Sequence, residues 1–292
     1  MILHRLAKLR SRRGNERILL GVASLIFLTS LILSYRNLPS VVLDWRWLLL
    51  TAGATAVVLL VNGLEYKVAG RMLGHPIGLG EAFRVGILSS AANLLPIPGA
   101  VLVRTQALKM KGSRYGEAFK STGAIGAGWL GIALTLAGLL LALSGNLLVG
   151  LGFLVAVVGA LVAMVILVRL AGGSATSSCL QVIAVETVFV LLSGVRVYAS
   201  LHGIGVDASA TQALALTVAA ALANAAGIFP GGLGLREIIA GALSPLVGLP
   251  VAAGVLGAVI DRLIGLIVLA IATLIVIVVV KRDDEEPSRG EA

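Results

Sequence analysis

Long apolar runs separated by short polar breaks occupy most of this 292-residue chain. A helix that crosses the hydrocarbon core of a bilayer needs about 20 predominantly apolar residues. Six runs come close to or exceed that length, and we interpret each as a transmembrane span. The predicted spans are Ile18–Ser34, Leu48–Arg71, Glu117–Leu143, Leu147–Leu170, Leu180–Leu201 and Val251–Val280.

Two other apolar stretches are interrupted by a Pro-Gly sequence and predict pairs of short helices. The first pair covers Leu79–Leu94 and Ala100–Lys111, and the second covers Ser209–Ile228 and Gly234–Val247. The second helix of the first pair is too short to cross a membrane. We therefore expect re-entrant hairpins that enter and leave on one side, with fully spanning short helices as the alternative.

The order of these elements is the same in the two halves of the chain: two spans, a broken helix pair and a further span. Each half has an odd number of crossings in either alternative, so the second half is expected to insert upside down, as in many transporters. The predicted fold is an all-α polytopic membrane protein with two inverted repeats. Its predicted regions are a basic cytoplasmic N-terminus (1–17), the first repeat (18–144), the second repeat (145–280) and a polar, disordered cytoplasmic tail (281–292).

Composition and charge support this interpretation. The chain is 58% hydrophobic and only 13% charged, whereas soluble domains carry about 25% charged residues. Basic residues crowd the first 17 positions and flank the first hairpin, but the segments around the second hairpin contain no Lys or Arg. By the positive-inside rule, both termini and the open end of the first hairpin are expected on the cytoplasmic side of the inner membrane.

The broken pairs share a chemical motif. In NLLPIPGAVLVR, Pro98 and Gly99 precede Arg104, and in NAAGIFPGGLGLRE, Pro230 precedes Arg236 with the same spacing of six residues. A charge inside a membrane is costly and is a functional candidate by default. Glycines 231, 232 and 234 expose the backbone, and a helix N-terminus near Arg236 favours an anion. We expect a phosphate or anion site there, with Glu237 balancing Arg236 when the site is empty; a purely structural turn and ion pair is the alternative.

Other polar residues within the spans extend this candidate site. Asp261 and Arg262 are adjacent in the last span and must face different neighbours, so we expect one to pair with Arg236 or Glu237. Asn93 and Asn224 precede the breaks and could bind a headgroup or cap free carbonyls. Glu65, Lys67 and Arg196 are expected to extend to the headgroups, and Glu186 to make an internal hydrogen bond rather than carry a coupling proton.

Several kinds of chemistry find no support in the sequence. The chain contains no GxxxxGK[ST] phosphate loop, no HExxH motif and no GxSxG motif. His4, His75 and His202 are dispersed and form no cluster, so we expect neither a metal ion nor another cofactor. We also expect that the chain is not an enzyme.

The stretch FPGGLGLREIIAGALSPLVGLPVAAGVLGAVIDRLIGLI, together with NLLPIPGAVLVRTQALKMKG, resembles the lysylphosphatidylglycerol synthase transmembrane, or flippase-like, family. The resemblance implies a membrane domain that translocates aminoacylated phosphatidylglycerol, often beside a cytosolic transferase, with relatives that handle hopanoid or isoprenoid-linked lipids. No transferase-like stretch is present in the 292 residues. The positions that match the family signature are Pro230, Gly231, Gly232, Gly234, Arg236, Glu237 and Arg262.

These observations predict a flippase-like transporter of an anionic or phosphate-bearing lipid, which could be aminoacylated or isoprenoid-linked. The expected partners are the lipid itself and a separate transferase, and nucleic acid is not among them. Two alternatives remain open: a membrane-embedded transferase that uses Glu237 or Asp261 as a base, and a non-catalytic membrane subunit of a separate transferase.

Overall fold

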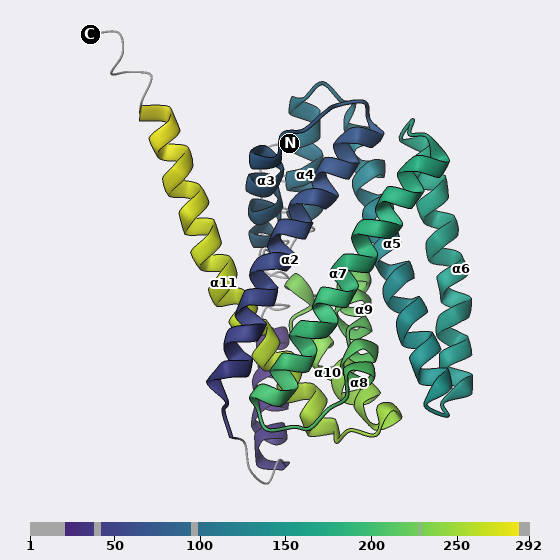
Figure 1. The fold of residues 1–292 in the computed structure, drawn as a ribbon, viewed down its shortest axis with the longest axis vertical. Coiled ribbons are helices and arrows are strands. Elements are labelled where there is room, and N and C mark those ends of the chain that lie inside the picture. The colour runs from purple at the N-terminus through teal and green to yellow at the C-terminus, as the bar shows by residue number, and fades with distance from the viewer. Residues whose placement is uncertain (1–20, 38–41, 95–98, 228, 286–292) are drawn as a thin grey trace, which may run out of the picture.

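The computed structural model describes residues 21–37, 42–94, 99–227 and 229–285, and all regular structure in these ranges is helical (Figure 1). Residues 21–37 form the first helix, which contains most of the first predicted span; residues 18–20 of that span lie outside the described residues. The all-α fold predicted from the hydrophobic pattern is confirmed.

Five long helices match the other predicted spans, and each has the length and apolar composition to cross a membrane. Helix α5 packs along α6, α2 packs along α7, and α11 crosses both α2 and α7. The last helix is longer than expected, because it continues to Glu285 through the start of the predicted disordered tail. The five helices are α2 (Trp45–Met72), α5 (Tyr115–Leu143), α6 (Leu147–Leu170), α7 (Ala175–Gly203) and α11 (Val251–Glu285).

The first predicted hairpin is formed by α3 (Leu79–Ala92) and α4 (Gly99–Met110), which pack against each other. Their contact is tight at Gly99, where an added Cβ would lie 1.9 Å from the Ala92 carbonyl oxygen. Only glycine fits so close to a neighbouring backbone. Pro98 and the rest of this break lie outside the described residues.

The second hairpin is more irregular than predicted. Its first arm is not one helix but two, because the hydrogen bonding changes at Thr217, whose N–H and hydroxyl both donate to the Leu214 carbonyl. This three-residue spacing tightens the backbone and ends the first helix. The elements are α8 (Ala210–Leu216), α9 (Val218–Ala226), the 3-10 helix η1 (Pro230–Gly232), α10 (Leu235–Leu243) and the 3-10 helix η2 (Ser244–Val247).

The two hairpins enter the bundle from opposite ends (Figure 1). At one end, Lys111 after α4 pairs with Glu81 of α3 at 2.8 Å; at the other, Gln212 of α8 donates to the Val247 carbonyl at 2.7 Å. The hairpin tips meet inside the bundle, where a Cβ on Gly231 would lie 3.3 Å from the Asn93 carbonyl oxygen. Opposite entry agrees with the inverted arrangement, while the repeat relationship itself stays a prediction.

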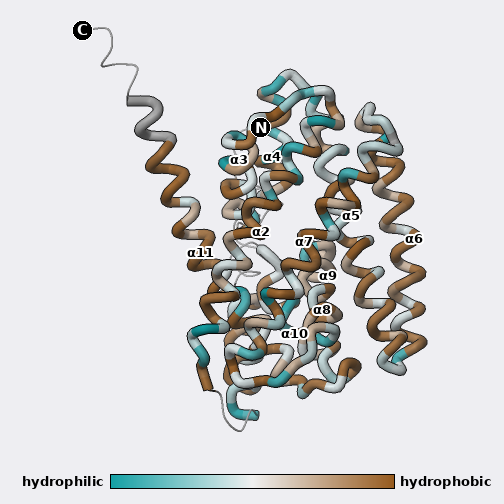
Figure 2. Tube along the Cα trace, in the orientation of Figure 1, coloured by the Kyte–Doolittle hydropathy of each residue, from teal (hydrophilic) through white to brown (hydrophobic). Residues whose placement is uncertain are grey.

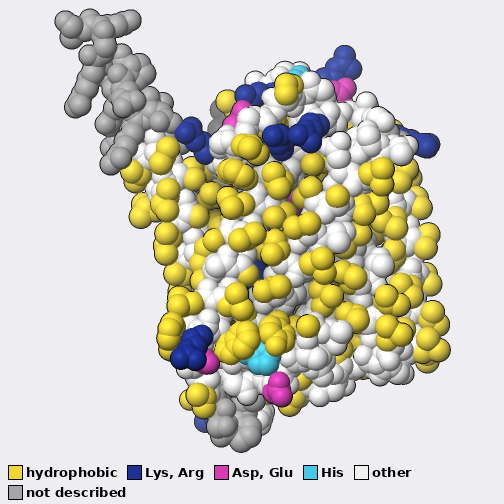
Figure 3. Space-filling view, in the orientation of Figure 1, with side chains coloured by type: hydrophobic (Ala, Val, Ile, Leu, Met, Phe, Trp, Pro, Cys, Tyr) yellow, Lys and Arg dark blue, Asp and Glu magenta, His cyan; other side chains and the backbone are white. Residues whose placement is uncertain are grey.

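The surface is that of a protein surrounded by lipid. Figure 2 shows apolar residues along most of the length of α6 and α11, and Figure 3 shows a broad apolar band with Lys and Arg gathered at the end that holds α3 and α4. Large side chains such as Leu148 and Val155 are 85% and 73% exposed. Together with the five apolar helices, this surface identifies a multi-pass membrane protein.

Candidate functional site

A cavity of about 830 Å³ lies where the two hairpins meet in the bundle. Residues from both hairpins and from α2, α5, α7 and α11 line it. This volume falls within the range of small-ligand sites, about 300–1,000 Å³. Six charged side chains line the cavity, two from the first half of the chain and four from the second: Glu65, Arg104, Glu186, Arg196, Arg236 and Asp261.

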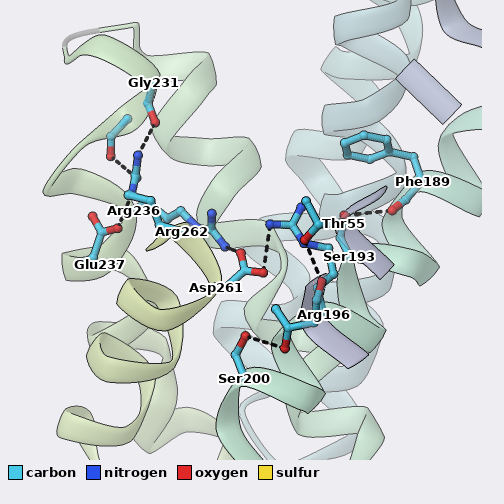
Figure 4. Close-up of polar contacts among 12 residues, drawn as sticks. Thr55, Phe189, Ser193, Arg196, Ser200, Gly231, Arg236, Glu237, Asp261 and Arg262 are labelled. Atoms are coloured by element: carbon cyan, nitrogen blue, oxygen red, sulfur yellow. Dashed lines mark hydrogen bonds and ion pairs between the residues drawn. The ribbon is translucent and has the colours of Figure 1, made fainter. Parts of the chain in front are cut away.

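On one side of the cavity, Asp261 of α11 lies between two arginines (Figure 4). Arg236, in the first turn of α10, donates a hydrogen bond to Asp261 Oδ2, and Arg196 Nη2 of α7 lies 2.9 Å from Oδ1. The Asp261 side chain is only 1% exposed. A single buried carboxylate therefore forms ion pairs with two guanidinium groups. We call Arg196, Asp261 and Arg236 the arginine-rich cluster.

A second ion pair lies beside this cluster and fixes the broken backbone of the hairpin. Arg262 Nε donates to Glu237 Oε1 at 2.7 Å, while its two Nη atoms donate to the carbonyls of Gly231 and Gly232 at 3.0 and 3.1 Å. Glu237 Oε2 in turn accepts from the Gly234 N–H at 2.9 Å. Carbonyl and N–H groups that the break frees are thus satisfied inside the protein.

This arrangement corrects the expected pairing of Arg236 with Glu237. The two residues are neighbours on α10 and point about 100° apart, as Asp261 and Arg262 do on α11. Two parallel pairs form instead, Arg236 with Asp261 and Glu237 with Arg262. The first pair faces the cavity, whereas Glu237 and Arg262 are not among its lining residues.

On the other side of the cavity, Arg104 of α4 is buried against α2. Its Nη1 lies 2.6 Å from Glu65 Oε2, and its Nε donates to the hydroxyl of the fully buried Ser89 at 3.2 Å. The expectation that Glu65 extends to the headgroups is wrong, as it is for Arg196. Both lie seven residues before the end of their helix, about 10 Å deep, which is too far for their side chains to reach the surface easily.

Glu186 of α7 completes this side of the cavity. The residue is 1% exposed, and neither carboxylate oxygen has a hydrogen-bond partner in the described part of the chain. The expected internal hydrogen bond is therefore absent. Arg104 and Glu65 are the charged groups that act on Glu186 electrostatically. We call Glu65, Arg104 and Glu186 the acid-rich cluster.

The two asparagines that precede the breaks also line the cavity. Asn93 ends α3, with its N–H donating to the Ser89 carbonyl at 3.1 Å, and Asn224 lies in the last turn of α9. In the described ranges, no three His, Cys, Asp or Glu side chains lie close enough together to hold a metal ion.

The cavity thus brings together Asn93, Arg104, Asn224, Arg236 and Asp261 from the residues predicted by sequence. Sequence reasoning missed the roles of Glu65, Glu186 and Arg196 there. The available signal was their position more than one turn inside an apolar span, where charged side chains face the protein interior.

No curated protein sequence matches the chain. The sequence model of the lysylphosphatidylglycerol synthase TM region matches residues 170–273, which include both arginines of the arginine-rich cluster and the Glu237–Arg262 pair. This match indicates a membrane function related to lipids. Over these residues it supports the resemblance to the lysylphosphatidylglycerol synthase transmembrane family that the motif of the second hairpin predicts.

Proposed function

We propose that this protein is a flippase-like transporter that moves a phosphate-bearing lipid between leaflets, with the headgroup passing through the cavity between the hairpins. The observation that carries the proposal is that Arg104 and Arg236, one from each hairpin, line a single cavity inside a membrane-spanning bundle. Breaks at corresponding positions of two halves are typical of transport sites.

The arginine-rich cluster is the proposed phosphate site. Asp261 can balance one of its two arginines, so the cluster keeps one uncompensated positive charge. A phosphate supplies the balancing negative charge and can accept paired hydrogen bonds from the planar guanidinium groups. Because Asp261 already holds both arginines in place, the headgroup meets an ordered site.

The lipid tails would remain outside the cavity. An apolar groove of about 300 Å³ runs between α3 and α11, lined by residues such as Leu94, Leu269 and Ala270. Leu94 also approaches Gly231, a residue of the cavity wall, so the groove adjoins the hairpin tips. We assign this groove to an acyl chain, because its lining is apolar and it adjoins the hairpin tips that wall the headgroup site.

An embedded transferase fits the site less well. It needs a free base beside its substrate, and the two candidates were Glu237 and Asp261. Glu237 pairs with Arg262 and does not line the cavity, while Asp261 is held by two arginines. Neither of these two candidates is therefore a free base beside the cavity, and a separate transferase remains the proposed protein partner.

We also propose that the protein lies in the inner membrane with both termini in the cytoplasm, because basic residues gather at the end that holds the open first hairpin. Single cysteines at Arg114 and Asp207, in a Cys179→Ser background, test this orientation. Arg114 is exposed beside the first hairpin, and Asp207 is exposed before the second. An impermeant thiol reagent outside intact cells should label only the cysteine at position 207; labelling of both or of 114 alone contradicts the orientation.

The transport proposal is tested by reconstitution into vesicles with a panel of labelled lipids, scored for both leaflet exchange and chemical products. We expect exchange of phosphate-bearing lipids without a new product. Arg236→Ala should lose this exchange, and Arg114→Ala, at an arginine whose side chain is 88% exposed, should keep it. Product formation would support a transferase, and equal exchange by wild type and Arg236→Ala would contradict the proposed site.

A further inference from the structure

We infer that Glu186 is a proton-binding site that couples lipid movement to a proton gradient, so that one proton accompanies one phosphate headgroup. This inference rests on the proposed function. It starts from Glu186 itself, a carboxyl group that lines the cavity although both its oxygens are buried and lack a hydrogen-bond partner among the described residues.

The residues that pack beside Glu186 at the contact between α5 and α7 are apolar. Helix α7 meets α5 at Gly128, where an added Cβ would lie 2.4 Å from Val182 and 3.6 Å from Glu186 Cγ. Met164 of α6 lies beside the same glycine. Gly128 of α5 and Met164 of α6 therefore present no charge beside the Glu186 side chain.

The charged neighbours of Glu186 come from two other helices. Glu65 of α2 and Arg104 of α4 act on it electrostatically, with opposite signs. Arg104 is already in a 2.6 Å ion pair with Glu65. The arginine that acts on Glu186 is therefore already paired with another carboxylate, and a buried carboxylate without a partner is costly unless it takes up a proton or a cation.

Proton binding changes the charge of the whole cavity. Its lining contains three arginines and three carboxylates, so it is neutral when all are ionised and has one positive charge when Glu186 carries a proton. A phosphate with one negative charge restores neutrality. Because net charge at membrane depth is unfavourable, the proton and the phosphate favour each other's binding.

The resulting cycle moves one proton with one lipid. Water on one side delivers a proton to a Glu186 oxygen as the headgroup enters the arginine-rich cluster, and both leave on the opposite side, the proton to water. The loaded cavity is neutral overall, so a gradient of one pH unit should shift the leaflet ratio of the lipid by up to about tenfold.

The test compares wild type, Glu186→Gln and the control Glu117→Gln in vesicles that contain fluorescent phosphatidylglycerol. Glu117 lies at the start of α5, with a side chain that is 39% exposed and 4.0 Å from Arg114. Wild type and Glu117→Gln should accumulate the lipid in one leaflet when a pH gradient is imposed. Glu186→Gln should exchange the lipid without a gradient but show no accumulation, because the amide cannot release a proton.

Infrared difference spectra of the purified proteins test the proton site without relying on transport. Wild type should show a carboxylic acid C=O band that follows pH and is absent from Glu186→Gln. If no such band titrates, the inference is overturned. If the lipid exchanges but the gradient has no effect, coupling is overturned while the transport function stands. If the band titrates but no lipid exchanges, the transport function and the coupling both fail, and Glu186 remains a proton site.

Discussion

The acid-rich and arginine-rich clusters lie on the same cavity and contain the same kinds of residue in opposite proportions. In the first, Arg104 pairs with Glu65 and acts on Glu186 only electrostatically; in the second, Asp261 is shared by Arg196 and Arg236. The hairpin arginine follows its proline by six residues in both halves. The repeated motif therefore places an arginine on each side, while unrepeated residues of the neighbouring spans set the charge around it.

The two clusters also differ in whether the residues that line the cavity are the same ones that stabilise the hairpin. In the second half, the Glu237–Arg262 pair holds the hairpin break from outside the cavity, which leaves Arg236 to face the ligand. In the described part of the first half, Arg104 both contacts α3 through Ser89 and lines the cavity. We therefore expect that some substitutions in the second half change only stability and others only transport, whereas a substitution of Arg104 changes both.

The largest effect is expected from Asp261→Asn, which removes the carboxylate shared by Arg196 and Arg236, whose side chains are only 14% and 16% exposed. Leaving a buried charge without its partner costs about 3–5 kcal/mol. The free energy or temperature of unfolding in detergent measures the loss, with Asp207→Asn at an exposed loop position as the control. Adding Arg196→Gln should recover part of the stability. An unchanged unfolding transition in Asp261→Asn would show that the ion pairs of Asp261 do not stabilise the protein.

Arg236→Ala should reduce lipid exchange strongly while the protein stays folded, because Asp261 keeps Arg196 as its partner. Loss of a hydrogen bond to a charged group, about 1.5–3 kcal/mol, corresponds to roughly a ten- to hundredfold slower exchange. Arg236→Lys should be partly active, since a point charge does not replace the two-pronged guanidinium. Wild-type exchange rates in the Ala variant would make Arg236 a structural residue.

A smaller loss of stability, about 1–3 kcal/mol, is expected from Glu65→Gln. Arg104 loses its ion pair but keeps its hydrogen bond to Ser89 and the nearby charge of Glu186. Unfolding of Glu65→Gln and Asp261→Asn under the same conditions compares the two clusters directly. If Glu65→Gln loses as much stability as Asp261→Asn or more, Glu186 does not replace Glu65 in balancing the charge of Arg104.

The smallest effect is expected from Ala270→Trp, which fills part of the apolar groove between α3 and α11. If an acyl chain uses this groove, exchange should slow by a few-fold, because the headgroup site is untouched. Ala272→Trp, on a neighbouring position of α11 that does not line the groove, is the matched control. Equal rates in both variants would place the acyl chain elsewhere.

The hydrophobic pattern was sufficient to predict the helices and both broken pairs, since span length and the Pro-Gly breaks follow from local physics. It failed at Thr217, where one side chain changes the hydrogen bonding of an otherwise uniform helix. The positions of the hairpin arginines also followed from their spacing.

The partners of those arginines could not be predicted in the same way. Glu65 lies 39 positions before Arg104 in the chain, and Arg196 lies 65 positions before Asp261, so only tertiary packing brings each pair together. The choice between Glu237 and Asp261 as the partner of Arg236 depended on the rotation of α10 against α11. Neither the packing of distant helices nor the rotation of one helix against another can be inferred from residue type or local spacing.

The most direct test of the central claim, that both clusters serve one headgroup pathway, is leaflet exchange by Arg104→Ala, Arg236→Ala and the double variant in the same vesicles. Steps in series predict that each single variant is slow and that the double variant is little slower than the slower single one. Wild-type exchange in both directions by Arg104→Ala, or a double variant slowed by the product of the two single effects, would contradict a shared pathway.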